Sequence, residues 1–262
     1  MLNLSELTDK VRALAIEAGD FIREERKKFH REAIEKKHAH DYVSYVDKES
    51  EKKIVTRLKE VLPEAGRIAE EGSGTLNDEQ YCWLVDPLDG TTNFIHDNAP
   101  YCVSIALRSK KELLLGVVYE ICRNECFWTY KGAPSYLNGN EIHVSAISNL
   151  DDSFIALGFP YATEEYKPMA NHLVNTLYGN VAGLRLMGAA AVELCYIAAG
   201  RFEARIEAFI GPWDIAAGTI ILQNAGGMIT DFKGGDSYSS GSQVLASNGR
   251  IHRDLLNIID NL

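Results

Sequence analysis

The residues that point most directly to chemistry form an acidic turn after an apolar run of strand type. Residues 81–85 are apolar, and Asp86 and Asp89 follow them, three positions apart, with Pro87 between. Pro87 fixes its own φ angle and biases the preceding residue toward an extended conformation. Two carboxylates and the Leu88 carbonyl on one stiff turn are hard oxygen ligands, which suit Mg²⁺.

The next residues, Gly90, Thr91 and Thr92, add the chemistry of an anion site. A tight turn with free N–H groups and hydroxyls is a setting for a phosphate oxygen. A metal and a phosphate on one loop would indicate phosphoester chemistry. However, Asp-Gly near proline is also a common turn signature, so this segment alone leaves both interpretations open.

Two more acids occupy comparable positions elsewhere in the chain. Glu70 ends a short apolar run, and Asp214 lies where a helix is expected to begin. Taken alone, Asp214 is typical of a helix N-cap and Glu70 of a solvated turn. Together with Asp86 and Asp89, they make four carboxylates, each at the end of an apolar segment.

In order and spacing, these segments resemble the signature blocks of the inositol monophosphatase family, whose members are lithium-sensitive, Mg²⁺-dependent phosphatases. The resemblance extends from Leu4 to about Ile251. The matching blocks are Glu70-Glu71, residues 86–93 (DPLDGTTN), residues 213–218 (WDIAAG), and Lys36 with residues 41–47 (DYVSYVD), which are similar to the family's mobile loop.

The resemblance implies Mg²⁺ as the cofactor, with two or three ions in each subunit. It implies Glu70, Asp86 and the Leu88 carbonyl around a first ion. A second ion would be bound by Asp86, Asp89 and Asp214, and a third, weaker one would lie near Glu70. Mg²⁺ usually keeps several water ligands, so an incomplete protein cage is expected.

The resemblance also implies the catalytic residues Thr91, Asp47 and Glu70. Thr91 would orient a metal-activated attacking water, and Asp47 would accept a hydrogen bond from its hydroxyl. Asp47 also has the position of an N-cap for the second helix. The backbone N–H groups of Gly90 and Thr91 would hold the phosphate, and Glu71 would support the neighbouring ligand.

Substrate residues are implied less specifically. Glu207 lies seven residues before Asp214, where the family places an acid that accepts hydrogen bonds from a sugar or inositol hydroxyl. Asp214 would contribute to substrate binding as well. The segment that would face the substrate consists of Gly188, Ala189 and Ala190.

Two departures from the family pattern leave the natural substrate open: Ala189 and Gly72 replace the usual Ser or Thr. The favoured substrate is inositol 1-phosphate, because Glu207 would repel a second phosphate. Alternatives on the same fold are fructose 1,6-bisphosphate, histidinol phosphate and 3′-phosphoadenosine 5′-phosphate. A Mg²⁺-binding regulatory protein is the alternative from another class. The net charge of −10 argues against a nucleic-acid partner.

The composition is typical of a globular protein, and no association with a membrane is expected. Of 262 residues, 46% are hydrophobic, enough for a substantial core. The five cysteines are odd in number and are expected to be buried reduced thiols. Without a signal peptide or a long apolar stretch, the protein is expected to be cytoplasmic. The resemblance implies a homodimer.

The predicted fold class is α/β (α+β), and the resemblance implies a layered α-β-α-β-α sandwich. Residues 1–140 are expected to form a lobe with two helices, an antiparallel sheet and most metal ligands. Residues 141–262 would form an α/β lobe with a mixed sheet that completes the site. Predicted helices cover residues 4–29, 47–62, 188–199 and 214–224, and predicted strands cover residues 101–107, 113–119, 125–130, 153–157 and 202–207.

Overall fold

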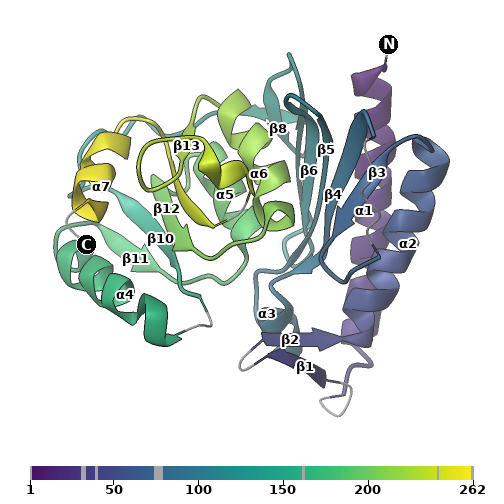
Figure 1. The fold of residues 1–262 in the computed structure, drawn as a ribbon, viewed down its shortest axis with the longest axis horizontal. Helices are drawn as coiled ribbons and strands as arrows, with labels where there is room; N and C mark the ends of the chain where they lie inside the picture. The colour runs from purple at the N-terminus through teal and green to yellow at the C-terminus, as the bar shows by residue number, and fades with distance from the viewer. Residues whose placement is uncertain are drawn as a thin grey trace.

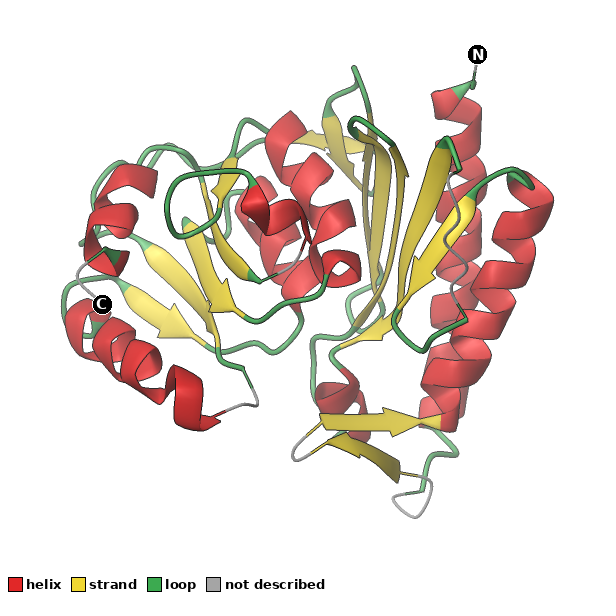
Figure 2. Cartoon of the chain, viewed as in Figure 1, coloured by secondary structure: helices red, strands yellow, loops and turns green. Residues whose placement is uncertain are grey.

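The computed structural model describes residues 2–30, 34–38, 41–73, 79–160, 163–240 and 242–260. Helices and sheets alternate in five layers, as Figures 1 and 2 show. The outer helices are α1 (Leu4–Arg26) and α2 (Tyr45–Val61) on one side and α4 (Thr163–Leu177) and α7 (His252–Ile259) on the other, and the central helices are α5 (Ala190–Ala198) and α6 (Pro212–Asn224). The predicted α-β-α-β-α arrangement is confirmed.

The larger sheet has, in the described part of the chain, seven strands in the order β3-β4-β5-β6-β7-β8-β9. β3 (Gly66–Ala69) runs parallel to β4 (Tyr81–Asp89), and every later neighbouring pair is antiparallel. The predicted antiparallel sheet is therefore confirmed from β4 to β9, and β3 adds a parallel strand at its edge. The other strands are β5 (Cys102–Ser109), β6 (Leu113–Glu120), β7 (Glu125–Tyr130), β8 (Ser135–Leu137) and β9 (Asn140–Ile142).

The smaller sheet is mixed, as predicted, with the order β11-β10-β12-β14-β13. β10 is parallel to β11 and β12, and β14 is antiparallel to both its neighbours. The bounds are β10 (Phe154–Gly158), β11 (Gly183–Arg185), β12 (Ala204–Ala208), β13 (Met228–Thr230) and β14 (Gln243–Ser247). The sequence analysis missed β11, β13 and β14. β11 and β13 have three residues each, too few to show a periodic pattern. The division of the chain into two lobes at residue 140 stays a prediction.

Several elements outside the two large sheets were also missed. They are helices α4 and α7, the hairpin of β1 (Ile34–His38) and β2 (Asp41–Ser44), helix α3 (Thr91–Ile95) and the 3-10 turn η2 (Ser237–Ser240). The block that resembles the family's mobile loop therefore falls on this hairpin and on the first turn of α2.

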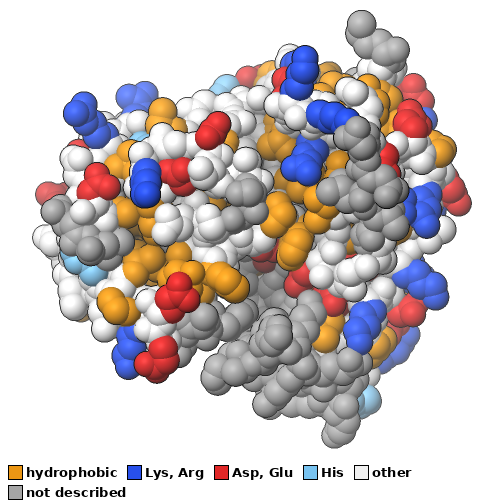
Figure 3. All heavy atoms as spheres, viewed as in Figure 1, with side chains coloured by type: hydrophobic (Ala, Val, Ile, Leu, Met, Phe, Trp, Pro, Cys, Tyr) orange, Lys and Arg blue, Asp and Glu red, His pale blue; other side chains and the backbone are white. Residues whose placement is uncertain are grey.

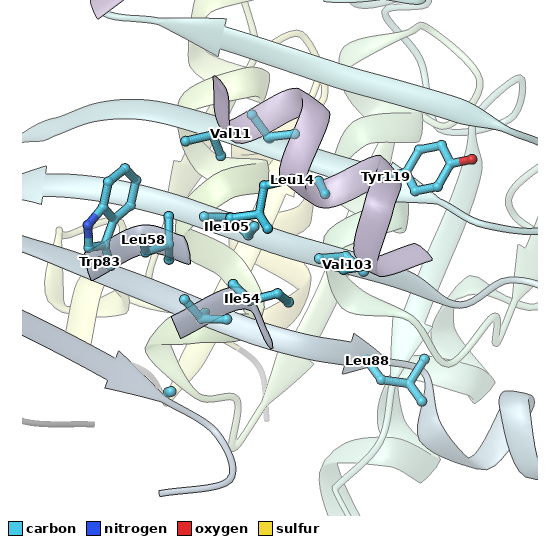
Figure 4. Close-up of a cluster of buried hydrophobic side chains, with 14 of the residues drawn as sticks. Val11, Leu14, Ile54, Leu58, Trp83, Leu88, Val103, Ile105 and Tyr119 are labelled. Atoms are coloured by element: carbon cyan, nitrogen blue, oxygen red, sulfur yellow. The ribbon is translucent and has the colours of Figure 1, made fainter. Parts of the chain in front are cut away.

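The apolar stripe predicted on the first helix faces the larger sheet. Val11 and Leu14 of α1 and Ile54 and Leu58 of α2 are buried in one cluster with side chains of β4 and β5, as Figure 4 shows. Burying each large aliphatic side chain contributes roughly 1.5–3 kcal/mol. This cluster therefore fixes the helical layer against the strand that carries Asp86.

Helix α6 is apolar on all sides because it lies between the two sheets (Figure 1). Glycines at two contacts let its neighbours approach closely. A Cβ on Gly116 of β6 would lie 2.6 Å from the Ala217 carbonyl oxygen, and a Cβ on Gly218 would lie 2.7 Å from the Leu194 side chain of α5. These close contacts fix the position of α6, and with it the helix start that carries Asp214.

Two expectations drawn from composition concern the cysteines and the membrane. Cys82, Cys102, Cys126 and Cys195 are buried free thiols, as expected, but Cys122 is exposed. Cys122 lies in the turn between β6 and β7, so the expectation of burial is wrong there. In the described part of the chain, no helix has the length and apolar character needed to cross a membrane.

The imidazole of His252 should make stability depend on pH. It is buried against the Thr230 and Ser247 hydroxyls, 3.0 and 2.8 Å away, and burial lowers the pKa of His252 from 6.5 to about 4. Between these two values the unfolded chain therefore binds more protons than the folded chain. The contribution of His252 to the free energy of unfolding is fully present above pH 6.5 and is lost as the pH falls toward 4. The difference in unfolding free energy between wild type and His252→Asn, measured by urea titration, should shrink over this range. A difference that is constant with pH would contradict the assignment.

Candidate active site

A β-bulge brings the two aspartates of the acidic turn together. Side chains three apart on a regular strand point to opposite faces. Here Asp86 pairs with Ser104 and Asp89 with Cys102, so three steps on β4 are matched by two on β5. The extra residue turns Asp89 back toward the side of Asp86. Pro87 sits within this irregularity, where its missing N–H costs no regular ladder bond.

Asp89 is held by the start of helix α5. Its two carboxylate oxygens accept hydrogen bonds from the backbone N–H groups of Ala190 and Ala191, at 3.1 and 2.8 Å. Ala189, the N-cap of α5, has no side chain that could cap the helix. A carboxylate about a hundred residues away in the sequence therefore satisfies these N–H groups.

Asp214 occupies the first turn of helix α6 but is not its N-cap, so that prediction is wrong. The N-cap is Gly211, and Asp214 accepts a 2.7 Å hydrogen bond from the Gly211 N–H. Pro212 begins the helix, where a missing N–H is tolerated. This arrangement positions the Asp214 carboxylate at the helix start, beside the acids of β4.

Asp47 is likewise three residues beyond the N-cap of its helix, so the cap prediction is wrong here too. Ser44 is the N-cap of α2, and its backbone N–H and hydroxyl both donate to Asp47 Oδ2, at 2.8 and 2.6 Å. The other oxygen, Oδ1, accepts from the Thr91 hydroxyl at 2.9 Å. Asp47 is fully buried, and burial raises its pKa, while the Ser44 hydrogen bonds oppose the rise.

The loop that carries Glu70 is organised by a buried acid that the sequence analysis missed. Glu51 of α2 is buried, and its carboxylate accepts hydrogen bonds from the Glu71 and Ser73 N–H groups, at 2.7 and 2.9 Å. The Glu70 N–H donates to the Val85 carbonyl oxygen at 3.2 Å. These contacts hold Glu70 next to the end of β4.

The carboxylates repel one another strongly. Burial, followed by repulsion from Glu70, raises the pKa of Asp86 well above its usual value. Burial and the charge of Asp214 raise the pKa of Asp89 to about 7, and burial and the charge of Glu70 raise the pKa of Asp214 to about 7. Four acids that destabilise one another in this way form a donor set suited to a bound cation.

No three Asp, Glu, His or Cys side chains of the described residues already converge on a single point as metal ligands. The acids nevertheless face one cleft of about 480 Å³. Such an open oxygen set matches the habit of Mg²⁺, which retains water in its coordination sphere. On the face drawn in Figure 3, acidic side chains lie in the recess between the two sheets.

The cleft contains most of the predicted residues. Those on its lining are Glu70, Asp86, Leu88, Asp89, Gly90, Thr91, Gly188, Ala190, Glu207 and Asp214. Asp47 lies behind Thr91, and Ala189 is fully buried and does not line the cleft. A larger cavity of about 730 Å³ lies against α6 and contains none of the predicted residues, so size alone does not identify the site.

Three more residues of this region were missed. Asn93 donates to the carbonyl oxygens of Pro100 and Met187, both at 2.7 Å, and so ties α3 to the loop before α5. Glu193 and Arg205 form a buried ion pair at the cleft. A signal was present in the sequence, because Glu193 is the one charged residue of an otherwise apolar helix and Arg205 and Glu207 are charged residues in a short predicted strand.

Comparison with known proteins agrees with this geometry. The profile described as the inositol monophosphatase family matches residues 3–261. The chain is 39% identical to Nus factor SuhB of Pasteurella multocida over 225 residues, which are 85% of this chain and 84% of that protein. The chain therefore belongs to the inositol monophosphatase family, and the resemblance drawn from its sequence motifs is confirmed.

Solved structures give the same result for the fold. Extragenic suppressor protein suhB from Bartonella henselae has a TM-score of 0.90 at 32% identity, with 96% of this chain and 97% of that chain covered. Inositol monophosphatase from Anabaena (Nostoc) sp. PCC 7120 has a TM-score of 0.89 at 30% identity, with 100% and 98% covered.

The role of Glu51 can be tested by its removal. Glu51→Ala leaves the Glu71 and Ser73 N–H groups without their acceptor, so the free energy of unfolding should fall by about 1–3 kcal/mol in urea titrations. As a control, Glu60→Ala removes an exposed acid of the same helix, paired with Arg57, and should change stability by no more than about 0.5 kcal/mol. Equal effects of the two substitutions would refute a special role for Glu51.

Proposed function

We propose that the protein is a Mg²⁺-dependent phosphatase that hydrolyses a small phosphomonoester, with inositol 1-phosphate as its substrate. Family membership supports the phosphatase class. The observation that carries the proposal is that the carboxylates of Glu70, Asp86, Asp89 and Asp214 all line one cleft beside Thr91.

The family resemblance implies which residues would hold the metal. Glu70, Asp86 and the Leu88 carbonyl would bind one ion, and Asp86, Asp89 and Asp214 a second, with a third near Glu70. When bound, Mg²⁺ supplies charge neutralisation for the phosphoryl oxygens and lowers the pKa of water. The raised pKa values of these acids support a cationic occupant.

Thr91 and Asp47 have the geometry to orient a water molecule. A hydroxyl has one proton and two lone pairs, and the Thr91 hydroxyl lies 2.9 Å from Asp47 Oδ1 and 3.1 Å from the Leu88 carbonyl oxygen, the two acceptors for that proton. A Thr91 lone pair would then accept a hydrogen bond from a water molecule in the cleft and so orient that water. Asp47 keeps this direction because Ser44 holds its other oxygen.

Phosphate binding and alcohol selection use different parts of the cleft. The N–H groups of Gly90 and Thr91 would hold the phosphate, next to the metal ligands. Glu207 and the segment that includes Gly188 line the region beyond, which would receive the alcohol. A polyol with several hydroxyls offers donors to Glu207, whereas fructose 1,6-bisphosphate and nucleotide alternatives carry a second phosphate that this acid would repel.

A second candidate function comes from the relatives named Nus factor SuhB. Their name favours a regulatory role, in which Mg²⁺ binding would matter without turnover. Homodimeric assembly, a cytoplasmic location and the lack of a nucleic-acid partner stay predictions under either function. The two functions differ in whether any phosphomonoester is hydrolysed.

Activity should require Mg²⁺ and Asp89. In assays against a panel of phosphomonoesters, a chelator should abolish turnover, and Asp89→Asn should lower kcat/KM on the order of 10²–10³-fold, as for loss of one electrostatic stabiliser. Thermal unfolding should stay cooperative, because the substitution relieves repulsion and the Asn side-chain oxygen can still accept one of the two hydrogen bonds from the start of α5. Asp9→Asn, an exposed change on α1, is the control and should retain full activity. Full activity of Asp89→Asn would contradict the assignment of Asp89 as a metal ligand. A wild type that hydrolyses none of the phosphomonoesters would favour the regulatory function.

Lithium should inhibit hydrolysis. Li⁺ is small and hard but carries a single charge, so at the site of Asp86, Asp89 and Asp214 it would occupy oxygen ligands without stabilising a leaving alkoxide. Initial rates at fixed Mg²⁺ should decline as Li⁺ rises, with Na⁺ at equal ionic strength as the control. Rates that respond identically to both salts would count against this second metal site.

A further inference from the structure

A buried chain of charges runs beneath the alcohol end of the cleft. Arg205 of β12 donates from Nε to Glu193 of α5 at 2.5 Å and from Nη2 to Glu207, also of β12. The side chains of Glu193, Arg205 and Glu207 are 1%, 3% and 15% exposed. One guanidinium therefore links an acid of the central helical layer to the acid that borders the cleft.

The neighbouring strands leave room for these large side chains. In the sheet register, Arg205 lies between Ala156 of β10 and Ala246 of β14. Gly158 of β10 stands opposite Glu207, and a Cβ at that position would come within 2.3 Å of the Glu207 carboxyl carbon. Small residues on both sides thus accommodate the chain of charges, which indicates a built arrangement.

The other end of this chain reaches the backbone at the edge of the cleft. The free oxygen of Glu193, Oε1, accepts hydrogen bonds from the Met187 and Gly188 N–H groups, both at 3.1 Å. Gly188 lines the cleft. Glu193 and Arg205 therefore fix two parts of the cleft wall relative to each other.

Arg205 is the only Lys or Arg among the described residues that line the cleft. Two carboxylates already hold it, so its charge is engaged in ion pairs with Glu193 and Glu207. Meanwhile Arg205 occupies one oxygen of Glu207, which leaves the other to accept a hydrogen bond from the ligand.

We propose that Arg205, anchored by Glu193, is a positioning residue that aims the Glu207 carboxylate at the leaving alcohol and so selects neutral polyols. The inference rests on the proposed phosphatase function and adds the determinant of its substrate class. A guanidinium holds two carboxylates in a fixed fork, whereas a lysine ammonium on a flexible stem does not. The length and planarity of Arg205 are therefore essential to the role.

The test compares two substrates in matched variants. Kinetics with Mg²⁺ would be measured for inositol 1-phosphate, whose alcohol is a polyol, and for p-nitrophenyl phosphate, whose leaving group offers no hydroxyl. Arg205→Lys removes the fork, and Glu193→Gln weakens the anchor while leaving Arg205 and Glu207 intact. The matched controls are Arg201→Lys, which alters a forked pair with Glu125 outside the cleft, and Glu203→Gln, which alters a buried acid just before β12.

In Arg205→Lys, kcat/KM for inositol 1-phosphate should fall about 10- to 100-fold, the range for residues that orient a directly acting group. The value for p-nitrophenyl phosphate should stay within about threefold, so the ratio of the two changes. Glu193→Gln should change the ratio in the same direction but by a smaller factor. If Arg205→Lys fails to fold, the ratio measured for Glu193→Gln is the test of the proposed role. The Mg²⁺ activation curve should not move.

Failure of the proposed role of Arg205 and failure of the proposed phosphatase function would give different results. The inference is wrong if the ratio of kcat/KM for the two substrates is the same in the active wild type and in both cleft variants. It is also wrong if the control variants change this ratio as much as the cleft variants do, since Arg205 would then be purely structural. Equal slowing of both substrates in the cleft variants would have the same meaning. A wild type that hydrolyses neither substrate would overturn the proposed function and this inference together.

Discussion

Mutual repulsion among buried carboxylates is the constraint on which the rest of the structure depends. Asp86 and Asp89 lie in one irregular strand end, and Glu70 and Asp214 are brought against them from elsewhere. Such crowding costs folding free energy, which the surrounding core must offset. The large apolar cluster behind β4 and the close packing of α6 supply that rigidity.

The same acids complete the helices around them. The N-caps of helices α5 and α6 are Ala189 and Gly211, neither of which has a capping side chain. Asp89 accepts from the first N–H groups of α5, and Asp214 accepts from the Gly211 N–H. A helix start without its own cap therefore attracts an anion, and the anion is held in a fixed direction. Local folding and site geometry are thus one set of contacts.

Much of the site could be predicted from the sequence because its residues lie in short, characteristic segments. The acidic turn with Asp86 and Asp89 is one such segment. The β-bulge that turns both side chains to one side could not be predicted, since it depends on the register with β5. Likewise, the link from Glu193 to Arg205 joins elements whose pairing is decided only by the tertiary fold. The prediction that Asp47 and Asp214 are N-caps is wrong for another reason. Each acid lies three residues after the true N-cap, which is the position of the acid in a capping box. For α2, the hydroxyl of Ser44 is the better sign of the N-cap.

The bond between the Thr91 hydroxyl and Asp47 joins the acidic turn to the outermost helical layer. Asp47 belongs to the first turn of α2, immediately after the hairpin β1–β2, so the ordering of that hairpin and the aim of Thr91 share one anchor. If the start of α2 loosened, the Thr91 hydroxyl would lose the Asp47 acceptor and keep the Leu88 carbonyl oxygen, 3.1 Å away. The first turn of α2 is therefore connected by one hydrogen bond to the residues that line the cleft, although no side chain of α1 lines it.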